Sequence, residues 1–308
     1  AADSSLVHAV AGKRPAATTV TPGSAPGSTA TIAAAPGTGM TASSAAQIPA
    51  VAAETSIVEP VAAKRDSGAT FQLSNVGAVP VTVVMNTYAS RIGGHNGAKV
   101  RLGSAGNPVL KYELVTNGGQ AVDLSGTAFQ TSRSGNDIKY STMVGGSAVT
   151  IKYATLPDSF LSHVSGSVAG AKSGSYLVVR LPETFAATEP DTNDDRNSLA
   201  FAFLTKREAA RNVPFHSLDP GEKQLVEGPV TWIVAKSKYF VVGLLAPKKG
   251  PEFTEATLVG GPRVTKIATR ADGTVVIPIV NGNFAFDMYA GPQEWKKLNA
   301  LGRDFDQV

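Results

Sequence analysis

The sequence predicts a mainly β protein: a large antiparallel β-sandwich that follows a disordered N-terminal linker and ends in a short helix. Three observations lead to this prediction. The composition changes sharply near residue 68. From Phe71 onward, short β-type runs alternate with turn residues. Near the C-terminus the apolar spacing changes from the period of a strand to that of a helix.

Residues 1–68 are rich in Ala, Pro, Thr, Ser and Gly, and the first aromatic residue of the chain is Phe71. Small side chains cannot bury enough apolar area to offset the entropy lost when the backbone is ordered. We therefore expect residues 1–68 to be a disordered linker. A mucin-like or cell-wall stalk is the rival interpretation of this composition.

Residues 69–291 are expected to form the sandwich. Gly, Asn and Asp punctuate the gaps between strands, as in "NGG" at 117 and "ADG" at 271. Amphipathic helices do not intervene, and this favours antiparallel sheets. The predicted strands, apart from two discussed next, are Val79–Ala89, Val109–Thr116, Ile138–Val144, Ala148–Leu156, Ser159–Gly170, Ser175–Leu181, Leu199–Thr205, Pro262–Ala271, Gly273–Val280 and Asn283–Ala290.

The segment "GPVTWIVAKSKYFVVGLLAP" (Gly228–Pro247) is the most apolar part of the chain after the linker. A membrane-spanning helix needs roughly 18–20 apolar residues, and two lysines interrupt this run. The segment therefore predicts two adjacent central strands. Lys236 and Lys238 are expected near the turn between them or on a solvent face.

The stretch "GPQEWKKLNALG" predicts a short amphipathic helix within residues 292–308. Pro292 suits the first helical position and Gly302 suits a C-terminal cap. One face carries the apolar residues Trp295, Leu298 and Leu301. This face is expected to dock on the sandwich.

Several kinds of site are not expected. The chain has no cysteine, and its four histidines do not have the spacing of a metal site. The net charge of +4 without basic runs does not argue for a nucleic-acid partner. There is no nucleophile elbow, P-loop or dinucleotide fingerprint. The segment "GGHNGAK" (Gly93–Lys99) lacks the spacing and the terminal Ser or Thr of a phosphate loop.

The densest acidic cluster is "EPDTNDDRN" (Glu189–Asn197), which opens like a calcium-binding loop. The sixth position of such a loop should be Gly and is Arg196, and the twelfth should be Glu and is Ala202. An exposed loop between strands is therefore expected. The carboxylates that could form a pair for glycoside hydrolysis are Glu183, Glu189, Asp191, Asp194 and Asp195, and no pair among them stands out.

Structural roles are expected for the lysine pair and for His163, which are the two remaining candidates for catalysis. A buried lysine could act as a base, but lysines two apart, as Lys236 and Lys238 are, are typical of the solvent face of a strand. His163, in "FLSHVSG", is interpreted as a strand histidine. No catalytic, cofactor-binding or metal-ligating residue is predicted, no cofactor is expected, and the chain is not expected to be an enzyme.

Three segments resemble one known family. "TWIVAKSKYFVVGLLAP" is similar to a segment of bacterial YidC-type membrane protein insertases in which a Trp-Ile/Val pair precedes Tyr-Phe and an apolar run ending in Pro. "NVGAVPVTVVMNTYAS" (Asn75–Ser90) resembles the first strands of that family's periplasmic domain. "FAFDMYAGPQEWKKLNALGRDFDQV" (Phe284–Val308) resembles its closing strand and helix. One departure is "VVGLLAP", which lacks the expected aromatic residue.

This resemblance implies a periplasmic β-supersandwich related to galactose mutarotase, covering about residues 68–308. It implies a location at the bacterial inner membrane, on the periplasmic side, in a protein that assists the insertion and folding of inner-membrane proteins. The implied partners are the Sec translocon components SecDF and SecYEG and nascent membrane proteins. The chain begins with Ala and lacks a methionine start, so we expect it to be a fragment or a processed product of a longer protein. Membrane helices, with the insertase activity, are expected outside it, one of them beyond Val308.

Two other functions suit parts of the sequence. A carbohydrate-binding or mutarotase-like sandwich should show a cleft lined by aromatic and carboxylate side chains. A surface adhesin or stalk protein would suit the Pro/Thr-rich linker.

Overall fold

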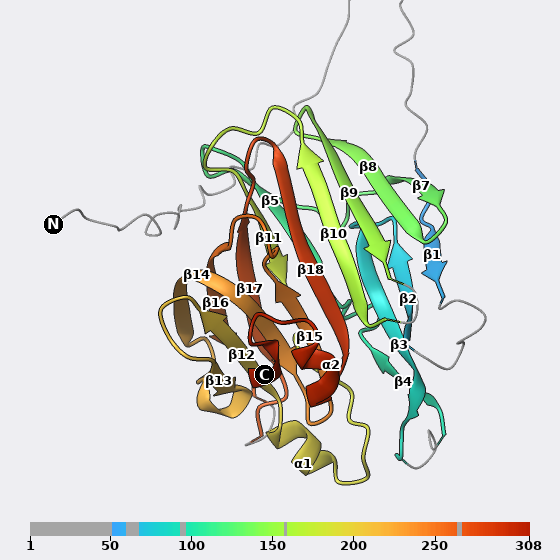
Figure 1. The fold of residues 1–308 in the computed structure, drawn as a ribbon, viewed down its shortest axis with the longest axis vertical. Coiled ribbons are helices and arrows are strands. Elements are labelled where there is room, and N and C mark those ends of the chain that lie inside the picture. Colours follow the sequence, from blue (N-terminus) through green and yellow to red (C-terminus); the bar gives the residue numbers. More distant parts are fainter. Residues whose placement is uncertain (1–50, 60–67, 93–96, 157–158, 264–266) are drawn as a thin grey trace, which may run out of the picture. The chain divides into compact units, whose positions relative to one another are not determined.

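Two antiparallel sheets form the fold (Figure 1). The computed structural model describes residues 51–59, 68–92, 97–156, 159–263 and 267–308, all within one unit, Pro49–Val308. The smaller sheet has the order β1-β2-β3-β4. Its strands are β1 (Thr55–Val58), β2 (Ala69–Ser74), β3 (Val79–Ala89) and β4 (Lys99–Leu102).

The larger sheet has the order β6-β5-β11-β17-β16-β14-β15-β18-β10-β9-β8-β7, and β12 and β13 branch from β14. Its strands are β5 (Lys111–Val115), β6 (Ala121–Asp123), β7 (Gln130–Ser134), β8 (Asp137–Val144), β9 (Ser147–Thr155), β10 (Leu161–Val168), β11 (Tyr176–Arg180), β12 (Ala200–Thr205), β13 (Arg211–Pro214), β14 (Lys223–Lys236), β15 (Phe240–Leu245), β16 (Phe253–Gly260), β17 (Ala271–Pro278) and β18 (Asn283–Pro292). The helical elements are α1 (Thr192–Asn197), α2 (Trp295–Asn299), η2 (Phe215–Ser217) and η3 (Phe305–Gln307).

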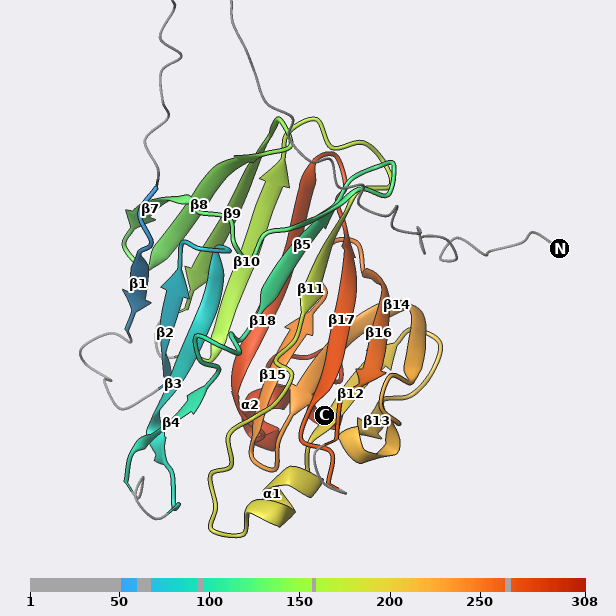
Figure 2. The same ribbon diagram turned by 180° about the vertical axis from the view of Figure 1, so that it is seen from behind.

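The larger sheet folds over so that β5, β11 and β17 lie against β18, β10 and β9 (Figures 1 and 2). Two buried tyrosines join these layers: the hydroxyl oxygens of Tyr112 on β5 and Tyr153 on β9 are 2.6 Å apart. Tyr153 donates its proton to the carbonyl of Ala78, beside the smaller sheet, at 2.8 Å. Tyr112 therefore donates to Tyr153. Burial raises the pKa of both phenols. Both hydroxyls therefore stay protonated and can donate the two hydrogen bonds that run from Tyr112 through Tyr153 to Ala78.

The predicted central strands are confirmed as β14 and β15, which pair from Trp232↔Leu245 to Lys236↔Val241. Every residue of β15 is buried, as is Trp232–Ala235 of β14. Both faces of these strands are therefore covered, which explains why the sequence here is almost continuously apolar. Lys236 ends β14, and Lys238 lies in the turn to β15, as expected.

The structure corrects several expectations about strands. Thr55–Val58, inside the segment predicted to be a disordered linker, is strand β1 and pairs with β2, burying Ser56 and Val58. Residues 1–50 and 60–67 of that segment lie outside the described residues. Of the predicted strand Pro262–Ala271, the described residues before Ala271 are irregular.

The predicted turn "ADG" is also wrong, because Ala271–Gly273 opens strand β17. A Cβ atom on Gly273 would lie only 2.5 Å from Cε1 of Phe201. The glycine is therefore there to admit the Phe201 ring against the backbone of the strand, and not to make a turn.

The C-terminal helix follows the last strand directly, as predicted, but starts later. Pro292 is the last residue of β18, paired with Phe240, and α2 begins at Trp295. Trp295 was expected to dock on the sandwich, and its side chain is instead 62% exposed. Leu298 is the helical residue that is buried.

Candidate functional site

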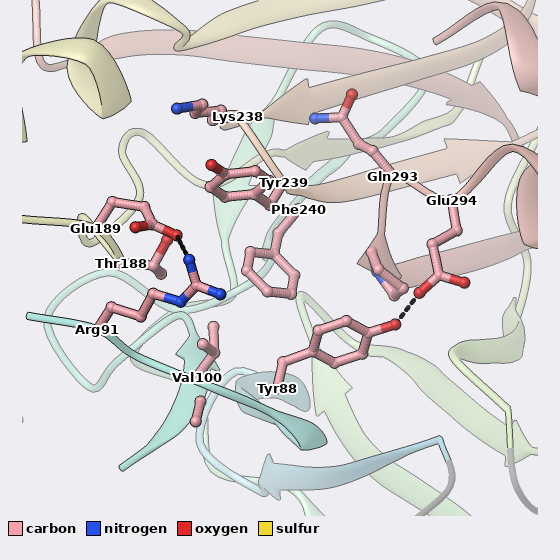
Figure 3. Close-up of a pocket in the computed structure, with 12 residues that line it drawn as sticks. Tyr88, Arg91, Val100, Thr188, Glu189, Lys238, Tyr239, Phe240, Gln293 and Glu294 are labelled. Carbon is pink, nitrogen blue, oxygen red and sulfur yellow. Dashed lines mark hydrogen bonds and ion pairs between the residues drawn. The ribbon is translucent and has the colours of Figure 1, made fainter. Parts of the chain in front are cut away.

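A cleft of about 340 Å³ opens where four separate parts of the chain meet (Figure 3). They are the end of β3 with β4, the loop before α1, the β14–β15 turn, and the junction of β18 with α2. The residues that line it are Tyr88, Ala89, Arg91, Val100, Thr188, Glu189, Lys238, Tyr239, Phe240, Pro292, Gln293 and Glu294. We call this the Tyr88–Tyr239 cleft.

The register of β15 with β18 determines which residues form the apolar part of the cleft. Phe240 opens β15 opposite Pro292, the last residue of β18. The backbone N–H of Gln293 continues this pairing by donating to the carbonyl of Tyr239 at 2.8 Å. Tyr88, near the end of β3, meets Phe240 edge to face, with ring centroids 5.5 Å apart. The smaller and larger sheets therefore share one aromatic surface here.

Glu294 fixes one wall of the cleft. Its carboxylate accepts hydrogen bonds from the hydroxyl of Tyr88 and from the ammonium of Lys297 on α2. These two bonds, with that of Lys297 first, lower the pKa of Glu294. Burial, followed by the bond to Glu294, raises the pKa of Tyr88. The wall therefore holds a neutral phenol against a carboxylate and connects the cleft to the C-terminal helix.

The opposite wall carries two ion pairs. Arg91 approaches Glu189 at 3.8 Å (Figure 3), and its backbone N–H donates to the carbonyl of Thr188 at 2.8 Å. Lys238 approaches Asp194 of α1 at 2.5 Å, and its ammonium lies 5.1 Å from the centroid of the Tyr239 ring. The rim is thus formed by charged groups of both signs.

The acidic cluster is more ordered than predicted, because it contains helix α1 and not only a loop. Asp191 caps this helix by accepting hydrogen bonds from the N–H groups of Asn193 and Asp194. Asp195 is buried and accepts from the N–H groups of Thr188 and Glu189 at 2.6 and 3.1 Å. These carboxylates shape the loop that forms one wall of the cleft.

The five carboxylates singled out in the sequence do not converge on one site. Glu183 lies 2.8 Å from the ammonium of Lys111 on β5, away from the cleft. Only Glu189 lines the cleft. The second carboxylate of the cleft, Glu294, was not among the sequence candidates. Its proximity depends on the register of β15 with β18, which the sequence does not reveal.

The remaining sequence candidates have structural surroundings. His163 lies on β10, as predicted, and its Nδ1 atom contacts the carboxylate of its cross-strand partner Asp287. Burial lowers the pKa of Lys236, which is half-buried at the end of β14. Of the segment Gly93–Lys99, residues 93–96 lie outside the described residues. In the described part of the chain, no three His, Cys, Asp or Glu side chains are arranged to hold a metal ion.

A second feature is the docking of the C-terminal segment, residues 300–308, on β14, β15 and β18. Arg303 and Asp304 both have left-handed backbone angles, with φ of 62° and 53°, and they redirect the chain after α2. Phe305 is then fully buried, 5.5 Å from the ring of Trp232 and 5.7 Å from that of Tyr289 between centroids.

Polar contacts fix the same segment. The guanidinium of Arg303 approaches Asp287 of β18 at 2.6 Å and donates to the carbonyl of Ala246. The indole N–H of Trp232 donates to the carbonyl of Arg303 at 2.9 Å. The end of the chain is therefore part of the core and not a loose tail.

A family model described as the YidC periplasmic domain matches residues 67–308. The chain belongs to the YidC periplasmic domain family. The resemblance seen in the sequence is thereby confirmed, and the family is that of a domain associated with a membrane insertase, in the periplasmic region of an inner-membrane protein. No match was found among curated proteins. None of the helices among the described residues of this YidC periplasmic domain has the length and apolarity that a bilayer span requires.

Matches to solved structures were found as well. An Escherichia coli K12 protein described as an aldose 1-epimerase has 9% identity and a TM-score of 0.46, covering 78% of this chain and 99% of its own. A 4-α-glucanotransferase from Thermococcus litoralis has 10% identity and a TM-score of 0.35, and the match covers 77% of this chain and 37% of the glucanotransferase. An α-galactosidase from Lactobacillus brevis has 11% identity and a TM-score of 0.41, and the match covers 82% of this chain and 41% of the galactosidase. The YidC periplasmic domain described here is itself mainly β and antiparallel, which confirms the predicted fold class.

Proposed function

We propose that this chain is the periplasmic part of a YidC-type insertase and that it assists the insertion and folding of inner-membrane proteins, alone or with the Sec translocon. Family membership across residues 67–308 is the observation that carries the proposal. The proposed partners are SecDF, SecYEG and nascent membrane proteins. Contact with the membrane would be through helices outside this chain.

The docked C-terminal segment supports a role in positioning. Phe305 and Arg303 attach the end of the chain to three central strands of the larger sheet. A membrane helix that follows Val308 would then be held in a fixed relation to the sandwich. In this proposal residues 1–68 are the linker, except for strand β1 (Thr55–Val58), which belongs to the sandwich with residues 69–291, and residues 292–308 are the connection to the membrane.

A supporting role without catalysis suits the carboxylates and lysines considered above. Asp191 and Asp195 stabilise local backbone, while Glu183 and Asp194 lie in ion pairs with lysines. We infer that the domain has no catalytic centre and no cofactor, and that it acts through surfaces that bind other proteins.

Site-specific photocrosslinking in living cells tests the proposed partners. A photoreactive residue is placed in the full-length insertase at four exposed apolar positions on different elements: Ile57, Met143, Leu225 and Trp295. We expect adducts with Sec components or a nascent membrane protein from at least one position. A photoreactive residue at the buried Phe305 position serves as the control, since it should give no adduct. If a functional insertase gives no such adduct at any exposed position, the proposal is wrong.

A further inference from the structure

We propose that the Tyr88–Tyr239 cleft is a binding site for a neutral saccharide. This inference goes beyond the insertase role and does not depend on it. It arises from three features of the cleft: an aromatic surface, a rim whose charges balance, and walls that are held in place by contacts within the protein.

The aromatic surface consists of Tyr88, Tyr239 and Phe240, with Pro292 beside them (Figure 3). Tyr239 is 40% exposed, so part of its ring is open to a ligand. The C–H bonds on the faces of a sugar ring carry small positive charges, and aromatic faces are negative, so the two attract each other. The exposed ring of Tyr239, beside the buried ring of Phe240, therefore offers apolar surface for a sugar ring on the side away from the ammonium of Lys238.

The rim favours a ligand without net charge. Arg91 and Lys238 contribute two positive charges, and Glu189 and Glu294 contribute two negative ones. An anion would meet the carboxylates and a cation would meet the arginine and lysine. A neutral ligand that both donates and accepts hydrogen bonds can use groups of both kinds, and sugar hydroxyls do so. Gln293 adds an amide to the same rim.

The cleft is preformed. Glu294 connects Tyr88 to α2 through hydrogen bonds, and Gln293 donates from its side chain to the carbonyl of Ser237. The Arg91 backbone is bonded to Thr188, whose loop is held by Asp195. Ligand sites in proteins are usually such concave, partly apolar clefts of about 300–1,000 Å³ with a few fixed polar groups. At about 340 Å³ the cleft is sized for a small saccharide.

Saturation-transfer NMR and titration calorimetry with the full 308-residue chain test this proposal. The probes are the neutral disaccharides maltose, cellobiose, lactose and chitobiose at millimolar concentrations. We expect at least one to bind, and Tyr239→Ala to weaken that binding by about tenfold or more. Tyr239→Phe should retain binding, because the ring is kept. Tyr176→Ala, which alters a half-buried tyrosine of β11 outside the cleft, should leave it unchanged.

Three results would overturn the proposal. One is that none of the four disaccharides binds the folded chain. Another is that Tyr239→Ala binds as tightly as the parent while its thermal unfolding is unchanged. The third is that an extended apolar peptide binds in the cleft, with Tyr239→Ala abolishing this binding, while the saccharides do not; the cleft would then be a polypeptide site.

Discussion

The indole N–H of Trp232 donates a 2.9 Å hydrogen bond to the carbonyl oxygen of Arg303. This bond joins the middle of a central strand to the last residues of the chain. Around it lie the rings of Phe305 and Tyr289 and the ion pair between Arg303 and Asp287. The C-terminal segment therefore docks on Gly228–Pro247, the most apolar segment after the linker.

Replacing Trp232 by Phe should destabilise the domain by about 2–4 kcal/mol, because it leaves the partly buried Arg303 carbonyl without this hydrogen bond and opens a small void beside Phe305. Urea unfolding followed by circular dichroism measures this. Hydrogen exchange should also become faster at residues 303–308. A variant with unchanged exchange at these residues would show that the Trp232 bond does not hold the segment.

Replacing Phe305 by Ala should cost about 3–5 kcal/mol, since a fully buried ring is removed. The matched control is Trp295→Ala, ten residues earlier. Its ring is 62% exposed, so a cost within about 0.5 kcal/mol is expected. Thermal and urea unfolding of both variants measure the two losses of stability. Equal losses of stability would mean that Trp295 packs as the sequence had suggested.

The central strands could be predicted because burial on both faces leaves a direct trace in the sequence. Trp232–Ala235 and all of β15 are buried, and the corresponding residues are apolar without alternation. In contrast, β7 reads "QTSRS" and has no apolar residue, because it is an edge strand with one neighbour and little buried surface. Sequence periodicity cannot reveal a strand that is held mainly by backbone hydrogen bonds.

The cleft and the docked segment could not be predicted for a different reason. Tyr88 and Glu294 are 206 positions apart and meet only through the register of several strands. Phe305 stands in "RDFDQV", a stretch too short and too acidic to show any amphipathic period. Trp295 misled the prediction, since its spacing from Leu298 fits one helical face but α2 has fewer than two turns. A helix this short docks mainly through Leu298.

Replacing Asp287 by Asn should destabilise the domain by about 3 kcal/mol, because it leaves the guanidinium of Arg303 without its anionic partner when only 12% of that side chain is exposed. Glu227→Gln is the control: its pair with Arg207 is long, at 3.7 Å, and both side chains are mostly exposed. A change within about 0.5 kcal/mol is expected there. If Asp287→Asn costs no more than this control, the ion pair contributes little to docking.

Gly243 on β15 should tolerate no side chain, although its backbone is not left-handed. A Cβ atom there would lie 2.6 Å from Cγ1 of Val234 and 3.0 Å from Cζ of Phe305. We expect Gly243→Ala to destabilise the domain by about 1–3 kcal/mol through overpacking. In the background of Phe305→Ala the cost should fall, since one of the two clashing groups is gone. A double-mutant cycle measures this coupling, and strictly additive costs would contradict it.

The carboxyl of Asp272 on β17 should make the stability of the domain depend on pH in a direction opposite to that of most carboxylates. Burial, followed by the nearby charge of Glu183, raises the pKa of Asp272 above its ordinary value of 3.8. A carboxyl whose pKa is raised by folding contributes stability below the unfolded pKa and loses that contribution as the pH rises through the folded pKa. Asp272→Asn should therefore stabilise the domain at about pH 7. The gain should vanish near pH 3, where both states of the parent are protonated.

Asp123 on β6 is the control with the opposite sign. Hydrogen bonds from the side chain and backbone of Ser125 lower the pKa of Asp123, so its contribution is present above the unfolded pKa and is lost as the pH falls through the folded one. Asp123→Asn should accordingly destabilise the domain at about pH 7 and have little effect at strongly acidic pH. Urea unfolding of both variants across this range measures the two curves. If Asp272→Asn also destabilises the domain at neutral pH, its carboxylate is stabilised by contacts that outweigh burial and the charge of Glu183.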